Sequence, residues 1–209
     1  MTATMGRSMP ARPTRPALQV RYDRRRQEIV YAAAKVFATQ GYDQTTMQDL
    51  AASMGLATGA LYHYFTSKEQ LLISVCDQLM EPLLARAREI VLDDAAPDEH
   101  LRALVRLWVA HVIDHRDHML VFQQERHTIE SGAQWRGVRE SRKSFDRLME
   151  HALALAGAHG PAGLDPRLAH LALLGMVNHT AQWYRPRGRF DAEQIADGYL
   201  ALVCGDSAA

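Results

Sequence analysis

The stretch GLATGALYHYFTSKEQLL, residues 55–72, decides the fold of this chain. It places four ring-bearing side chains in succession at positions 62–65, shortly after a Thr-Gly-Ala turn. A buried helix has no use for so many rings with polar tips, and a strand would not open with Thr-Gly-Ala. We therefore expect a short helix from residue 59 to about 64, with Thr58 as its N-cap.

Start signals for further helices flank this stretch on both sides. Ser67 opens a Ser-Lys-Glu-Gln capping box, which predicts a long helix to about residue 91 with a kink at Pro82. Thr45 opens a second capping-box pattern, which predicts a helix over 47–54. Before it, apolar residues recur at steps of three and four over 24–40, as they do on the buried face of a helix.

Three helices placed in this way, the last two joined by a turn that contains glycine, have the spacing of a helix-turn-helix. In that motif the last helix lies in the major groove of DNA, with its first residues against base edges. Small residues allow close approach to the DNA backbone, polar tips form hydrogen bonds, and Leu61 and Phe65 turn inward. The residues expected to contact DNA are Thr46, Thr58, Gly59, Ala60, Tyr62, His63 and Lys68.

The rest of the chain is also predicted to be helical. No stretch alternates apolar and polar residues convincingly enough to be a strand, and there is no internal repeat. We therefore expect an all-α fold in which a long helix joins an N-terminal three-helix domain to a C-terminal helical domain. The further helices are expected over 97–115, 117–130, 133–157, 166–184 and 191–204.

Charge is distributed unevenly along a chain whose formal net charge is zero. Residues 1–26 carry seven arginines against Asp23 alone, a net charge of +6, so the remainder carries −6. Arginines broken up by prolines next to the first helix suit an arm that reaches DNA phosphates or a minor groove. A disordered tail that only aids solubility is the alternative.

The composition argues against a membrane protein, a disulfide-bonded protein and an enzyme. No apolar run approaches the roughly 18 residues of a membrane helix, and Cys76 and Cys204 suit a reduced compartment. We therefore expect a cytoplasmic protein that does not contact the membrane. The sequence holds no nucleophile elbow, phosphate loop or Cys/His pair with an orienting group. An enzyme and a bound cofactor are not expected.

Two segments, IVYAAAKVFATQGYDQTT and TTMQDLAASMGLATGALYHYFTSKEQLL, carry a resemblance that covers residues 24–75. They resemble the DNA-binding domain of the TetR (tetracycline-repressor) family of bacterial regulators. The resemblance implies an all-helical homodimer that binds a palindromic double-stranded DNA operator. Together with the basic N-terminal segment, it predicts three parts, namely a disordered basic arm over 1–23, a helix-turn-helix domain over 24–70, and a ligand-binding and dimerisation domain over 71–209.

The segment NHTAQWYRPRGRFDAEQIADGYLALVCG, residues 178–205, resembles the C-terminal end of a TetR branch that senses acyl-CoA thioesters, including repressors of steroid-ring breakdown. This implies a repressor that an acyl-CoA releases from its operator. Such a ligand needs an apolar slot and cations for its phosphates. The candidate ligand-binding residues are Leu104, Trp108, Phe122, Arg139, Arg142, Met149, Met176 and Asn178. For the two arginines, the alternative is an ordinary solvated face beside Glu140 and Asp146.

A cluster of histidines gives a competing hypothesis. His111, His115 and His118 follow an H-x3-H-x2-H spacing, and three histidines can hold zinc. A metal sensor or a metal-dependent enzyme would use them. We expect no metal there, because the helix is predicted to break after His115 and there is no H-E-x-x-H motif.

Overall fold

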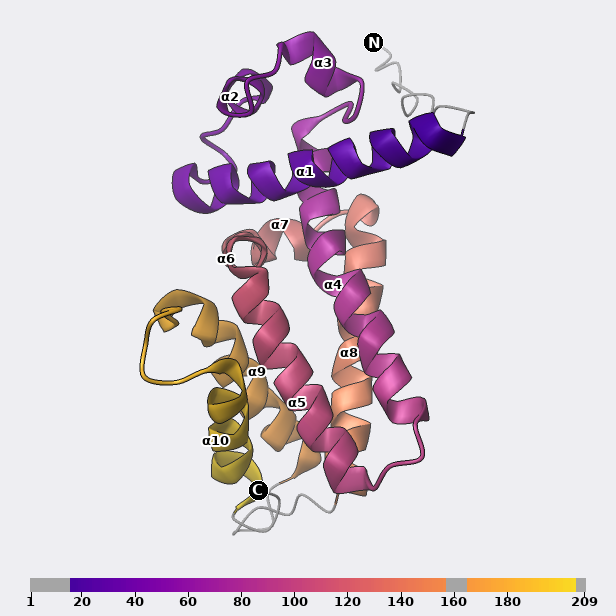
Figure 1. Cartoon of the computed structure of the whole chain (residues 1–209), viewed down its shortest axis with the longest axis vertical. Coiled ribbons are helices and arrows are strands. Elements are labelled where there is room, and N and C mark those ends of the chain that lie inside the picture. Colours follow the sequence, from indigo (N-terminus) through magenta and orange to yellow (C-terminus); the bar gives the residue numbers. More distant parts are fainter. Residues whose placement is uncertain (1–15, 157–164, 206–209) are drawn as a thin grey trace.

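The computed structural model describes residues 16–156 and 165–205, and every regular element within these ranges is a helix (Figure 1). The prediction of an all-α chain is confirmed. The helices are α1 (Pro16–Gln40), α2 (Met47–Ser53), α3 (Thr58–Tyr62), α4 (Lys68–Leu92), α5 (Pro97–Asp114), α6 (Arg116–Gln124), α7 (Arg126–Glu130), α8 (Arg136–Leu155), α9 (Pro166–Trp183) and α10 (Ala192–Cys204), with a short 3-10 turn at Ala133–Trp135.

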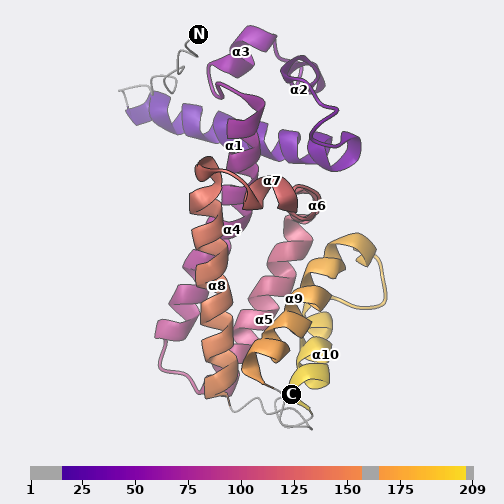
Figure 2. The ribbon, with the colours of Figure 1, turned by 180° about the vertical axis from the view of Figure 1, so that it is seen from behind.

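The chain forms two stacked parts that α4 connects. In Figure 1, α1 lies across the end of an upright bundle, and α2 and α3 lie on its far side. Helix α4 leaves this N-terminal part and runs down the bundle, packing against both α5 and α8, while α10 packs on α5. The reverse view shows α8 and α9 on the opposite face (Figure 2). None of the described helices combines the length and the apolar character that a membrane span requires.

The N-terminal part has a hydrophobic core to which its helices α1, α2 and α3 all contribute. Leu61 and Phe65 are fully buried, as their spacing predicted, and Phe37 of α1 is buried with them. Gly41 and Gly55 end α1 and α2 with φ of +83° and +64°, a backbone conformation that side chains with a Cβ rarely adopt. These two turns set the direction of the chain between α1 and α2 and between α2 and α3.

Helix α1 begins at Pro16, eight residues earlier than predicted. The assignment of residues 16–23 to a disordered arm was therefore wrong, and residues 1–15 lie outside the described ranges. The first turns of α1 pack against the segment that follows α3, where the ring of Tyr22 stacks on Tyr64 with centroids 4.9 Å apart. The hydroxyl of Tyr22 also donates to the carbonyl of His63 over 3.3 Å.

Two predicted caps are displaced by one residue. The N-cap of α2 is Thr46, whose hydroxyl accepts from the backbone of Asp49, whereas Thr45 is buried and donates to the Gly41 carbonyl. The N-cap of α3 is Ala57, so Thr58 is the first helical residue and not the cap. At α2, the cap is the threonine whose hydroxyl lies outside the core, whereas the cap of α3 makes no side-chain hydrogen bond.

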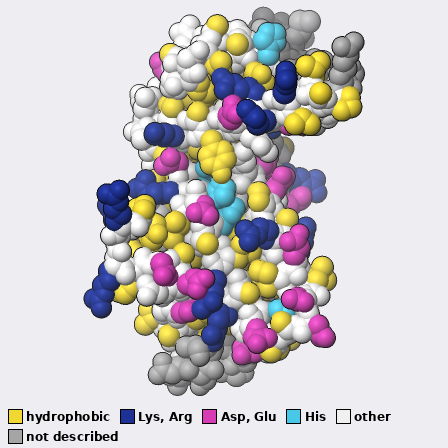
Figure 3. All heavy atoms as spheres, viewed as in Figure 1, with side chains coloured by type: hydrophobic (Ala, Val, Ile, Leu, Met, Phe, Trp, Pro, Cys, Tyr) yellow, Lys and Arg dark blue, Asp and Glu magenta, His cyan; other side chains and the backbone are white. Residues whose placement is uncertain are grey.

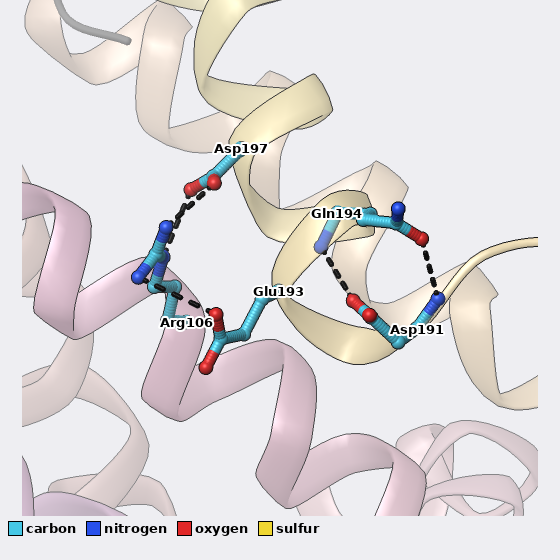
Figure 4. A network of polar contacts seen from close by, with 5 residues as sticks. All are labelled: Arg106, Asp191, Glu193, Gln194 and Asp197. Carbon is cyan, nitrogen blue, oxygen red and sulfur yellow. Dashed lines mark hydrogen bonds and ion pairs between the residues drawn. The ribbon is translucent and has the colours of Figure 1, made fainter.

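The last helix is held to α5 by a charged network (Figure 4). Arg106 donates to both carboxylate oxygens of Asp197, over 2.9 and 2.6 Å, and lies 3.7 Å from Glu193. These hydrogen bonds lower the pKa of Asp197. A bidentate pair restricts geometry as well as adding energy, so Arg106 sets the orientation of α10.

Candidate DNA interface and effector cavity

The α2–α3 pair has the geometry of a helix-turn-helix. Gly55 turns the chain just after α2, and the amide of Leu56 returns to the carbonyl of Ala51 over 2.8 Å, which closes a tight turn. Helix α3 then begins after Ala57, and Leu61 anchors it in the core. Because α3 lies at the end of the molecule, away from the bundle (Figure 1), its outer face can approach DNA.

The structure places most of the predicted DNA-contacting residues on accessible surface. Thr46, Gly59, Tyr62 and His63 are exposed. Thr58, Ala60 and Lys68 are half-buried. The space-filling view shows several Lys and Arg side chains on the same N-terminal part (Figure 3).

Lys68 and Thr46, which are predicted DNA contacts, have partners within the chain. The ammonium of Lys68 donates to the carbonyl of Tyr42 over 2.7 Å and lies 4.2 Å from the centre of its ring. The hydroxyl of Thr46 donates to the Asp49 carboxylate over 2.6 Å. Both side chains are therefore oriented before any DNA arrives.

A cavity of about 390 Å³ lies inside the bundle, a size within the usual range for small-molecule sites. Its walls come from α4, α5, α6, α7, α8 and α9, and most of the lining residues are apolar. The lining residues are Leu79, Met80, Leu83, Trp108, Met119, Phe122, Gln123, Arg126, Arg142, Phe145, Asp146, Leu171, Leu174 and Asn178.

Four of the eight predicted ligand-binding residues line this cavity, namely Trp108, Phe122, Arg142 and Asn178. The other four are not among the described residues that line it. Leu104 and Met149 are fully buried in the core, and Met176 packs against it. Arg139 instead donates to the carbonyls of Ile129 and Gly132, where it holds the end of α7. Helical periodicity identified buried faces but could not say which buried residue borders empty space.

The charged residues that line the cavity differ in how exposed they are to solvent. Arg126 is largely exposed and marks the rim, where it pairs with Glu130 over 3.0 Å. Arg142 is less exposed and lies 3.5 Å from the same carboxylate. Asp146 follows Arg142 by one helical turn and receives a hydrogen bond from His170 over 3.1 Å. Asp146 is thus not merely a neighbour on a solvated face, and no local signal in the sequence marks His170 as its partner.

The three histidines of the metal hypothesis do meet, at the junction between α5 and α6. The rings of His111 and His115 stack with centroids 4.1 Å apart, and His118 is 5.6 Å from His115. Their nitrogens, however, bond to protein atoms. His111 donates to the Leu79 carbonyl and His115 to the His111 carbonyl. The described residues contain no group of three or more potential ligands arranged to hold a metal ion.

The histidine cluster (His111, His115 and His118) connects the two parts of the molecule. The hydroxyl of Tyr31 on α1 shares a hydrogen bond of 3.0 Å with Nε2 of His115. On the other side, His111 bonds to Leu79, which lines the cavity. Burial lowers the pKa of His111 and of His118 to about 4. Histidine side chains are visible beneath α1 in Figure 3.

Comparisons with known proteins agree with this geometry. Residues 29–75 match bacterial regulatory proteins of the tetR family, and residues 94–206 match a tetracyclin repressor-like C-terminal domain. The HTH-type transcriptional repressor KstR2 of Mycolicibacterium smegmatis is 31% identical over 201 residues, 94% of each chain. The solved structure of the ketosteroid transcriptional regulator KstR2 of Mycobacterium tuberculosis has a TM-score of 0.78 at 30% identity and covers 87% of this chain and 93% of its own. AibR, solved in complex with isovaleryl coenzyme A and operator DNA, has a TM-score of 0.73 at 28% identity, over 87% and 98% of the two chains.

Proposed function

This chain belongs to the TetR family of bacterial transcriptional regulators, and we propose that it is a repressor released from its operator by an acyl-CoA thioester. The effector would occupy the cavity between α4 and α9. The protein would act in the cytoplasm, as a homodimer, and without catalysing a reaction.

The composition of the cavity is the observation that carries the choice of effector. Its inner wall is apolar and includes Trp108, Phe122 and Phe145, while two arginines lie toward the rim. An acyl-CoA has the same division, with an apolar acyl group and a nucleotide that carries several phosphates. Guanidinium groups bind phosphate well. The structural likeness to AibR, which binds isovaleryl coenzyme A, supports the same choice.

DNA reading would use the exposed end of α3. Tyr62 and His63 have accessible side chains, and Gly59 leaves room for the DNA backbone to approach. In a dimer, two copies of α3 would enter successive major grooves about 34 Å apart on a palindrome. The effector would weaken binding by favouring a state with a different spacing between the two copies.

The dimer would form through the outer faces of α9 and α10. Leu168 and Leu202 are exposed on these helices, and Leu202 is 74% exposed. Gly175 and Gly198 lie on the same two helices with open space around them. Leucines beside small residues let two helices pack closely.

The test is release of a fluorescent DNA fragment from the protein's own promoter by a panel of ligands. An acyl-CoA thioester should release the fragment, whereas the matching free acid and CoA alone should not. Arg142→Gln should raise the concentration of thioester required, because it removes a phosphate partner from the cavity. Arg147→Gln, on the exposed side of the same helix, is the matched control.

A second variant separates the acyl slot from DNA binding. Leu174→Trp adds bulk to the cavity wall and should block release while leaving operator affinity unchanged. The acyl-CoA assignment is overturned if a compound of another class releases the operator and no thioester does.

A further inference from the structure

The cavity contains a carboxylate that a plain acyl chain does not explain. Asp146 is the only acidic residue among the described residues that line it, and it lies beside Phe145. Its side chain is 28% exposed. Within the described ranges, one oxygen of Asp146 accepts from His170 and the other has no hydrogen-bond partner.

The partner of Asp146 holds it in a fixed orientation. His170 is only 2% exposed, and its ring lies against that of Trp108 with centroids 6.0 Å apart. Trp108 in turn meets Phe145 edge-on at 5.0 Å. Because a carboxylate accepts hydrogen bonds, Nε2 of His170 is the donor across 3.1 Å. The histidine therefore occupies Oδ1 and leaves Oδ2 available.

The neighbouring arginine does not supply the missing donor. Arg142 lies one turn before Asp146 on α8, at a spacing that often forms an ion pair. Its guanidinium instead lies 3.5 Å from Glu130, and no ion pair joins it to Asp146 among the described residues. Water that enters the cavity can donate to Oδ2.

Filling the cavity with a ligand removes that water. A carboxylate oxygen that loses its solvent donors without gaining a replacement is strongly disfavoured. An unsubstituted alkyl chain has no donor to offer, and a free carboxylic acid would add a second negative charge. A hydroxyl group supplies one donor at no charge and fits an otherwise apolar wall.

We propose that the effector is a hydroxylated acyl-CoA, whose hydroxyl donates a hydrogen bond to Asp146 held in place by His170. This inference rests on the proposed function and adds the chemical class of the acyl group. Asp146 is then the residue that determines specificity, and His170 is a positioning residue behind it.

The test compares octanoyl-CoA with a series of eight-carbon thioesters hydroxylated at successive carbons. Direct binding to the full chain is measured by calorimetry, alongside release of the promoter fragment. Wild-type protein should prefer at least one hydroxylated thioester by roughly 10- to 150-fold, the range for a hydrogen bond to a charged group. Asp146→Leu should abolish this preference and tighten binding of octanoyl-CoA.

Further variants keep the result interpretable. Asp146→Asn retains the shape of the side chain and removes its charge, and it replaces Asp146→Leu if that variant does not fold. It should reduce the preference. Glu150→Leu, one turn further along α8 and outside the cavity lining, removes an acid as a matched control and should keep the full preference. His170→Phe should lower the preference while octanoyl-CoA still binds.

The outcomes separate this inference from the function on which it rests. If octanoyl-CoA, the hydroxylated series and the other thioesters of the ligand panel all fail to bind and a compound of another class releases the DNA, the proposed function is wrong and the inference falls with it. If thioesters bind but no hydroxyl position improves affinity, the inference is wrong and the proposed function stands. It is also wrong if the preference survives in both Asp146 variants.

Discussion

Lowering the pH should destabilise this protein through buried histidines, and His118 is the best position for a test. His118 is 1% exposed, and its Nε2 donates to the side-chain oxygen of Gln78 over 3.1 Å. Burial, with a smaller effect of His115, lowers its pKa from 6.5 to about 4. The unfolded chain therefore binds more protons than the folded one between these two values. Stability is present above pH 6.5 and is lost as the pH falls through this window.

The size of the effect follows from the pKa shift. One pKa unit corresponds to about 1.4 kcal/mol, so His118 should remove about 2 kcal/mol from the free energy of unfolding between pH 7 and pH 5. His111 has the same shift in the same direction. Asp77 opposes both below pH 6, because burial raises its pKa to about 6 and the folded state then binds the extra proton. The dependence of the free energy of unfolding on pH contains the contributions of all three groups. A substitution at His118 isolates the contribution of that histidine.

His118→Gln keeps an amide that can donate to Gln78 but cannot take up a proton. Urea unfolding followed by circular dichroism, at one fixed protomer concentration, measures stability at pH 7, 6 and 5. Wild-type protein should lose about 2 kcal/mol more than the variant across this range. His127→Gln removes an exposed histidine and is the matched control. Parallel stability curves for wild type and His118→Gln would refute the reasoning.

Three other predictions concern the regulator cycle. Tyr62→Ala should weaken operator binding roughly tenfold with little loss of helicity, measured by fluorescence anisotropy and circular dichroism; unchanged affinity would remove Tyr62 from the interface. Tyr31→Phe removes the hydrogen bond to His115 and should weaken the coupling between effector and DNA, so that the ratio of DNA affinities without and with effector falls by up to about fivefold. Each ligand alone should bind as before. An unchanged ratio would show that the coupling does not pass through this hydrogen bond. Leu202→Glu should shift the protein toward monomer in analytical ultracentrifugation and abolish operator binding, and a stable dimer would move the interface elsewhere.

The sequence alone determined the N-terminal part almost completely. The signals there are local, because a cap, a helical repeat and a glycine with positive φ act over a few residues. Leu61 and Phe65 therefore turned inward as expected, and the turn at Gly55 lies where the sequence placed it. Errors were limited to boundaries, such as the N-cap at Thr46 instead of Thr45.

Only the tertiary structure decided the cavity and its polar groups. Asp146 and His170 are 24 residues apart on different helices, and nothing local marks them as a pair. Arg139 and Arg142 stand three residues apart in one basic cluster, yet one holds backbone carbonyls and the other lines the cavity. Helical periodicity says which face of a helix is buried, but whether a buried side chain meets a packed neighbour or an open space depends on how helices distant in sequence cross. That crossing is set by the packing of the whole bundle.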